Sequence, residues 1–110
     1  MKLSITSLEL KNPFKFFALS YNAMQILKQL KGTGYKDYKS TGFWTKHYTM
    51  TLWENQEDIN AFYKSGAHLD AMKKSREIAK EIRTIVIDAN SIPSWKEAKE
   101  HLKNAKVFRY

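Results

Sequence analysis

Apolar and polar residues alternate over residues 3–10 and again over 46–54, which is typical of β-strands with one buried face. Stretches rich in β-branched and aromatic residues predict two further strands, over 35–44 and 82–88. The strand over 46–54 is the clearest, and its two faces differ: Tyr48, Met50 and Leu52 against His47, Thr49, Thr51 and Trp53.

A long helix is predicted over residues 13–31, because apolar residues recur there at helical spacing. Asn12 and Pro13 suit its start, and Gly32 suits its end. Two apolar stripes cover most of its circumference: Phe14, Phe17, Tyr21 and Met24, and then Phe16, Leu19, Ala23, Ile26 and Leu30. We therefore expect this helix to be covered on two sides, by the sheet and by a neighbouring helix or a partner subunit.

Two more helical regions follow from capping signals. Asn55 suits the start of the first, which Gly66 interrupts and which resumes over 67–80. Ser94, followed by Glu97, forms a capping box for a terminal helix. The element order is thus βαββαβ plus one C-terminal helix. This order predicts a single α+β domain over residues 1–110, ferredoxin-like, with an antiparallel sheet and helices on one face.

Composition narrows the function classes. The 110 residues are 43% hydrophobic and contain no cysteine, which excludes disulfides, thiolate metal sites and cysteine nucleophiles. The net charge is +8, yet the lysines are scattered and only three residues are arginine, so nucleic-acid binding ranks last. No apolar run is long enough to span a membrane, and the N-terminus is not a signal peptide, so we expect a cytoplasmic protein.

The stretch from Tyr48 to Met72 carries a family resemblance. A strand that ends in Thr51-Leu52-Trp53-Glu54, followed by a helix with Phe62 and the step Gly66-Ala67-His68, resembles the dimeric α/β barrel superfamily. That superfamily includes the antibiotic-biosynthesis monooxygenases, and the spheroidene monooxygenase-like proteins are the most similar group. The resemblance implies a homodimer formed sheet to sheet. One sheet face would line the barrel, and the other would pack on helices and enclose a ligand cavity.

His68 is the candidate catalytic residue. At about 100° per residue it falls within the apolar arc of Met72 and Ala79, which predicts an inward direction. Haem-degrading relatives place an iron-ligating histidine on this helix, and they also use a tryptophan at the position of Trp53. A structural histidine and a core tryptophan are the alternatives. The asparagine of those relatives has no counterpart on the first strand, so we expect no cofactor and keep haem as the alternative.

A small apolar or acyl-type ligand is expected beside these residues. The candidate ligand-binding residues are Phe17, Tyr21, Trp53, Phe62, Met72 and Arg83. The aromatic residues would contact an apolar body, although the same spacing is found in an ordinary core. Arg83, like Lys46 and His47, would hold a carboxylate at a pocket mouth, and a solvated charge is the alternative reading for each.

Two other functions rank above nucleic-acid binding. The first is a monooxygenase-like enzyme acting on an apolar substrate, with His68 as base or hydrogen-bond donor. The second is a protein that binds an apolar or fatty-acyl-like molecule without chemistry. The sequence shows no nucleophilic triad, phosphate-binding glycine loop or metal-ligand spacing.

Overall fold

The computed structural model describes residues 1–30, 35–64, 66, 72–74 and 77–110. These residues contain a five-stranded antiparallel sheet in the order β2-β3-β1-β4-β5. The strands are β1 (Lys2–Leu10), β2 (Tyr35–Phe43), β3 (Lys46–Trp53), β4 (Ala79–Asp88) and β5 (Lys106–Arg109). The strand that comes first in the chain is therefore the central one. The predicted α+β, ferredoxin-like class is confirmed.

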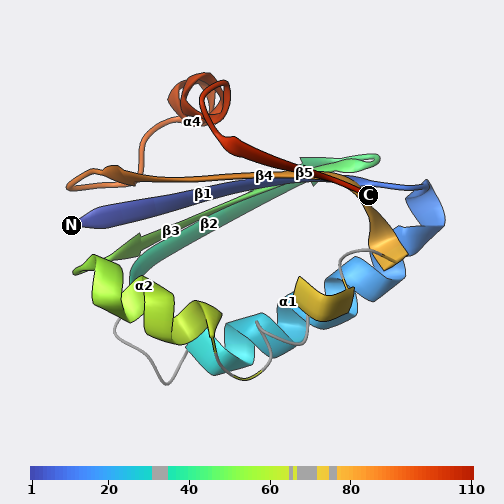
Figure 1. Cartoon of the computed structure of the whole chain (residues 1–110), viewed down its shortest axis with the longest axis horizontal. Helices are drawn as coiled ribbons and strands as arrows, with labels where there is room; N and C mark the ends of the chain where they lie inside the picture. Colours follow the sequence, from blue (N-terminus) through green and yellow to red (C-terminus); the bar gives the residue numbers. More distant parts are fainter. Residues whose placement is uncertain (31–34, 65, 67–71, 75–76) are drawn as a thin grey trace.

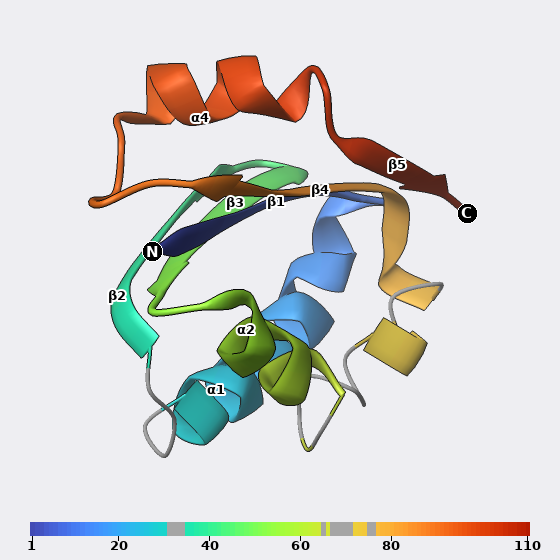
Figure 2. The same cartoon turned by 60° about the vertical axis from the view of Figure 1, so that its left-hand side comes forward.

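Helices cover both faces of this sheet. A 3-10 turn, η1 (Pro13–Lys15), leads into α1 (Phe16–Leu30), and α2 (Gln56–Tyr63) follows β3. Figure 1 shows α1 and α2 on one side of the sheet and α4 (Trp95–Leu102) on the other, and the turned view in Figure 2 agrees. The prediction that all helices lie on one face is therefore wrong. The strands carry aliphatic side chains on the second face too, and α4 removes them from water.

Strand register assigns every side chain to one of two faces. Leu3 is paired with Leu52 and Ile87, and Ile5 is paired with Met50 and Ile85. These side chains pack with Ala98 and Leu102 of α4 in one buried cluster. We call this side the α4 face and the opposite side the α1–α2 face.

Three local predictions are corrected or refined by the structure. Ala79 and Lys80, predicted as the end of a helix, belong to β4, because Ala79 pairs with Leu10 and the carbonyl of Lys80 accepts the N–H of Tyr110 at 3.1 Å. Asn12 makes no side-chain capping bond at the start of η1. The terminal segment, which the sequence left unassigned, forms the edge strand β5 beside β4.

The two predicted caps are confirmed. The side chain of Asn55 accepts the N–H of Asp58 at 2.9 Å, and Ser94 Oγ accepts the N–H of Glu97 at 3.2 Å. Each cap satisfies an N–H group that has no partner within its helix. In the ranges that the structure describes, no helix is long and apolar enough to cross a membrane.

Candidate functional site

An aromatic cluster occupies one end of the α1–α2 face. Trp53, the last residue of β3, is fully buried, and its ring lies 5.3 Å from that of Phe62 on α2. Tyr35 meets the same indole edge-on at 6.5 Å. Leu30 and Ile59 close the cluster. The structure thus brings together two of the predicted ligand-binding residues, Trp53 and Phe62, in a contact between strand and helix.

The indole nitrogen of Trp53 is the unusual atom of this cluster. Its Nε1–H is buried and has no hydrogen-bond acceptor within the described part of the chain. A buried donor without an acceptor costs about 1–3 kcal/mol, and native proteins contain few of them. An oxygen acceptor brought to this N–H would remove that cost.

Hydroxyl groups form the sheet surface next to the indole. Thr6 lies at the centre of β1, opposite Thr49 on β3 and Thr84 on β4, and the Oγ1 atoms of Thr6 and Thr84 are 3.4 Å apart. We call the following set the hydroxyl floor: Ser4, Thr6, Thr49, Thr51 and Thr84. Thr6, Thr49 and Thr84 are only half-buried although they lie on three adjacent inner strands beneath a helical layer. Water or a small molecule therefore has access to this floor.

Tyr63 connects α2 to the hydroxyl floor. Its phenol oxygen is hydrogen-bonded to Ser4 Oγ, across the interface between helix and central strand. Burial raises the pKa of the Tyr63 phenol above its usual value of 10.0, and the bond to Ser4 opposes that shift. Tyr63 is thus a neutral hydroxyl at physiological pH, able to donate or accept a proton in a hydrogen bond but not to act as an anionic base.

Helix α1 covers this face loosely. Leu30 is its one buried residue, whereas Phe17 and Tyr21 are 75% and 60% exposed and lie outside the aromatic cluster. Met72 is 52% exposed. In the single chain the stripe of Phe14, Phe17, Tyr21 and Met24 faces solvent, and its cover by a partner subunit stays a prediction.

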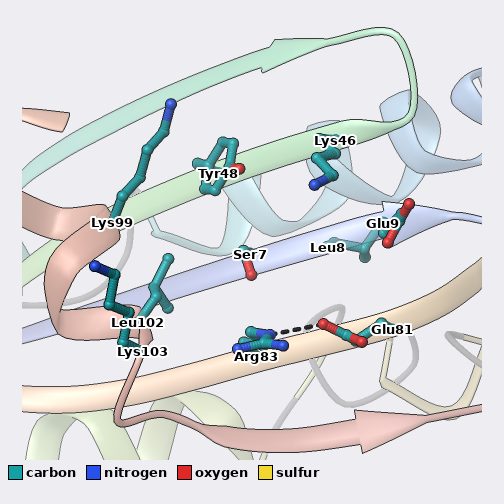
Figure 3. Close-up of a pocket in the computed structure, with 10 residues that line it drawn as sticks. All are labelled: Ser7, Leu8, Glu9, Lys46, Tyr48, Glu81, Arg83, Lys99, Leu102 and Lys103. Atoms are coloured by element: carbon teal, nitrogen blue, oxygen red, sulfur yellow. Dashed lines mark hydrogen bonds and ion pairs between the residues drawn. The ribbon is translucent and has the colours of Figure 1, made fainter. Parts of the chain in front are cut away.

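The remaining predicted site residues lie elsewhere. Arg83 is opposite Ser7 in the sheet and belongs to the α4 face, so it does not join Trp53 and Phe62. It lines a separate hollow, shown in Figure 3, where it is bonded to Glu81. His68 lies outside the described residues, and its proposed role stays a prediction.

Neither histidine within the described residues lies beside Trp53. No cluster of three or more His, Asp and Glu side chains in these ranges is suited to a metal ion. His47 is at the far end of β3, where Nε2 lies 3.3 Å from the carbonyl of Trp44, and His101 is on α4, across the sheet. Haem binding, through His68 or another residue, stays a prediction.

Sequence reasoning did not identify Tyr63 or the hydroxyl floor as a site. The signal was present in β1, where Ser4 and Thr6 alternate with Leu3 and Ile5, and in the threonines of β3. Hydroxyl residues at alternate positions of adjacent strands must share one face. What the pattern does not contain is the helix residue that reaches them, since Tyr63 reads as part of an apolar helix side.

Comparison with solved structures defines the class of the fold. A putative antibiotic biosynthesis monooxygenase from Deinococcus radiodurans superposes with a TM-score of 0.71 at 10% identity, over 86% of this chain and 97% of that one. A second, from Nitrosomonas europaea, gives 0.71 at 14% identity, over 83% and 100%. SnoaB, described as a cofactor-independent oxygenase from Streptomyces nogalater, gives 0.63 at 9% identity, over 83% and 94%. The chain therefore shares the fold of the antibiotic-biosynthesis-monooxygenase-like proteins.

Residues 16–107 match the family described as a domain of unknown function, DUF3291, and the chain belongs to that family. No curated protein matches the chain. The predicted likeness in fold to the antibiotic-biosynthesis monooxygenases is confirmed. The identities of 9–14% extend this likeness to the fold alone, and the finer resemblance to spheroidene monooxygenase-like proteins stays a prediction.

Proposed function

We propose that this protein is a monooxygenase-like enzyme that acts on a small, largely apolar substrate held between the hydroxyl floor and the α1–α2 layer. One observation carries the proposal: the buried Nε1–H of Trp53 has no acceptor among the described residues. It lies on the face that also carries accessible hydroxyls and apolar rings. A substrate with one oxygen acceptor on a flat apolar body satisfies all three features. The description of SnoaB as a cofactor-independent oxygenase supports the same chemistry.

The reaction that fits is oxidation of an activated methylene group. Loss of a proton from a CH₂ that lies between two aryl rings conjugated to a carbonyl gives a stabilised carbanion. Reaction with O₂ then converts CH₂ to C=O and releases water, so that one oxygen atom enters the product and the other leaves as water. The substrate supplies all four electrons, and this step requires no bound cofactor.

Named residues of the chain have distinct roles in this proposal. The Nε1–H of Trp53 donates to the substrate oxygen and stabilises the negative charge that develops there. Tyr63, oriented by Ser4, provides a neutral hydroxyl next to the reacting group. His68 is the proposed base, on the sequence argument alone. Phe62 and Trp53 exclude water from the apolar body.

The test is oxygen consumption with anthrone, whose balanced oxidation with O₂ gives anthraquinone and water. We expect Trp53→Phe to lower the rate about 10²-fold, the effect of removing one donor to a developing oxyanion. Trp95→Phe is the matched control, since Trp95 packs on the α4 face, and it should retain the wild-type rate. Equal rates for Trp53→Phe and wild type would contradict the role assigned to the indole.

A second candidate, binding of an apolar or fatty-acyl-like molecule without chemistry, is favoured by the exposed stripe on α1. Phe14 and Phe17 are 82% and 75% exposed, and Tyr21 and Met24 continue the same line. Such a run of accessible apolar side chains suits an extended acyl chain. Native mass spectrometry of protein purified from cells distinguishes the two: a retained acyl lipid favours this candidate, and a lipid-free chain that consumes oxygen favours the enzyme.

We also propose that the protein is a homodimer. The hairpin between β2 and β3 presents Phe43 and Trp44 at 86% and 69% exposure. Trp44 has φ 58°, a conformation that costs a residue other than glycine about 1–3 kcal/mol. Keeping a large aromatic residue there indicates a function for the exposed ring. Light scattering should give twice the chain mass for wild type and a monomer for Phe43→Ser/Trp44→Ser, and a monomeric wild type would exclude the dimer.

A further inference from the structure

Helix α1 presents an apolar stripe on the side that faces away from the sheet. Figures 1 and 2 show this helix on the outside of the α1–α2 face. Its one buried residue is Leu30, and at about 100° per residue Tyr21 points in the opposite direction. The four residues of the α1 stripe are 57% to 82% exposed: Phe14, Phe17, Tyr21 and Met24. Side chains exposed to this degree project from the helix, so the stripe is convex and does not form a groove.

The charge that accompanies the α1 stripe is entirely positive. The chain has no Asp or Glu within residues 10–36. Lys11 and Lys15 lie at the start of the stripe and Lys28 near its end, and none of the three forms an ion pair with a described residue. Lys28 lies almost in line with Tyr21, because seven residues make nearly two full turns. Apolar and cationic groups are thus presented together along one side of the helix.

The other two helices have the opposite charge at their starts. The first turn of α2 contains Glu57 and Asp58, and that of α4 contains Glu97. Acidic residues there stabilise a helix, because the N-terminal end of the helix dipole is positive. The first turn of α1 has none, and Lys15 directly precedes it. The lysines at this end therefore do not serve helix stability, and their charge is available to an anionic partner.

A second copy of the chain is a poor partner for the α1 stripe. A symmetric dimer uses the same surface on both subunits. Contact through α1 would bring the lysines of one stripe near those of the other, with no acidic residue on either helix to neutralise them. A dimer formed sheet to sheet, as the superfamily resemblance implies, would instead leave α1 on the outside. The stripe is therefore suited to a partner that is both apolar and anionic.

We propose that α1 binds the surface of an anionic lipid bilayer and lies in the plane of its headgroup region. The α1 stripe would enter the boundary between headgroups and acyl chains, while Lys11, Lys15 and Lys28 would extend to the lipid phosphates. A single acyl chain would cover only part of a convex stripe, whereas a bilayer surrounds it. The inference therefore goes beyond the acyl-binding candidate, and it does not depend on the proposed oxygenase activity.

The experiment is co-sedimentation of the full chain with two kinds of vesicle. One is phosphatidylcholine alone, and the other is equal parts of phosphatidylcholine and phosphatidylglycerol. We expect the anionic vesicles to sediment the protein and the neutral vesicles to leave most of it in solution. Binding to the anionic vesicles should weaken in 1 M salt, because salt screens the attraction between lysines and phosphates. Equal sedimentation with both kinds of vesicle, or with neither, would overturn the proposal.

Paired variants test the two components of the surface. Phe14→Ser/Phe17→Ser should weaken binding to the anionic vesicles about tenfold or more, because it removes two apolar side chains from the interface. Lys11→Gln/Lys28→Gln should have a similar effect through the loss of two charges. Lys96→Gln/Lys103→Gln is the matched control, since it removes the same charge at α4, across the sheet, and it should leave binding unchanged.

All of the substituted side chains except those of the control pair lie on the α1 side, and all six are exposed, so the fold should be retained, as circular dichroism can verify. Light scattering should give Phe14→Ser/Phe17→Ser the same mass as wild type. A smaller mass for this variant would show that the stripe is a contact between copies, and equal weakening by the two lysine pairs would show that only net charge matters. Either result would contradict the assigned membrane surface.

Discussion

The two faces of the central strand differ in chemistry although they alternate residue by residue. Leu3 and Ile5 are fully buried under α4, in an aliphatic cluster with Met50 and Leu52. Ser4 and Thr6 face the α1–α2 layer, where hydroxyls stay accessible and α1 buries a single residue. The comparison shows that α4 completes a buried aliphatic cluster, whereas the longer helix α1 leaves Thr6, Thr49 and Thr84 only half-buried.

The largest change in the free energy of unfolding is expected for a substitution that tests this difference between the two faces. Ile5→Ala should lower the free energy of unfolding by about 2–5 kcal/mol, because it opens a cavity in a packed cluster. Thr6→Ala, the next residue on the other face, should cost about 1 kcal/mol or less, as half-buried polar side chains usually do. Urea denaturation of both variants measures the difference. Similar losses would mean that both faces are equally packed.

A smaller effect is expected at the helix caps, one on each face. Asn55→Ala and Ser94→Ala should each lower stability by about 1 kcal/mol, because each removes the acceptor for a backbone N–H at the start of α2 or α4. Ser91→Ala is the control, an exposed serine just before α4 without a capping bond in the described structure. Thermal unfolding is sufficient for the measurement, and a cap whose loss has no effect would show that its helix adds little to stability.

Sequence patterns located four of the five strands and two helix caps, because strand alternation and caps are local. The alternation in β3 separates Met50 and Leu52 from Thr49 and Trp53, as the register confirms. The side of the sheet that α4 takes was not predictable in this way. It depends on the connection after β4 and on the aliphatic surface left open by the other helices. For the same reason the pattern could not show that Arg83 lies across the sheet from Trp53.

Only part of the candidate site's geometry was predictable. Trp53 and Phe62 were singled out from a strand end and a helix motif, and the structure brings their rings together, while their role in ligand binding stays a prediction. The unpaired Nε1–H is a property of the complete surroundings of the indole, and no sequence pattern reports it. Phe17 and Tyr21 lie outside the aromatic cluster and are exposed in the single chain, and their role as ligand-binding residues stays a prediction.

The third prediction concerns pH on the α1–α2 face. The pKa of Tyr63 is raised above 10.0 in the folded protein, chiefly by burial, so the fold favours the protonated phenol. The unfolded chain releases this proton first, and the stability contributed by the protonated form is lost as pH rises from 10 towards the folded pKa. Tyr63→Phe removes this titration. The free energy of unfolding of wild type, relative to that of Tyr63→Phe, should therefore fall between pH 8 and pH 11 when it is measured by urea unfolding. A difference that stays constant would contradict a buried phenol.

The smallest effect on stability is expected at the edge of the α1–α2 face, where an exposed ion pair connects the strands instead of a buried apolar contact. Lys2 and Asp88 are opposite each other on β1 and β4 and form an ion pair at 2.6 Å, with 84% of the Asp88 side chain exposed. The hydrogen bond and charge of Lys2 lower the pKa of Asp88 below 3.8. Its contribution is thus present above pH 3.8 and is lost as pH falls through the folded pKa. At pH 7, Asp88→Asn should lower the free energy of unfolding slightly. The loss should be smaller in 1 M salt, because salt screens exposed ion pairs, and it should disappear at a pH where Asp88 of the wild type is protonated. A loss as large as that of Ile5→Ala would show that the rim of the α1–α2 face is as important to the fold as the core under α4.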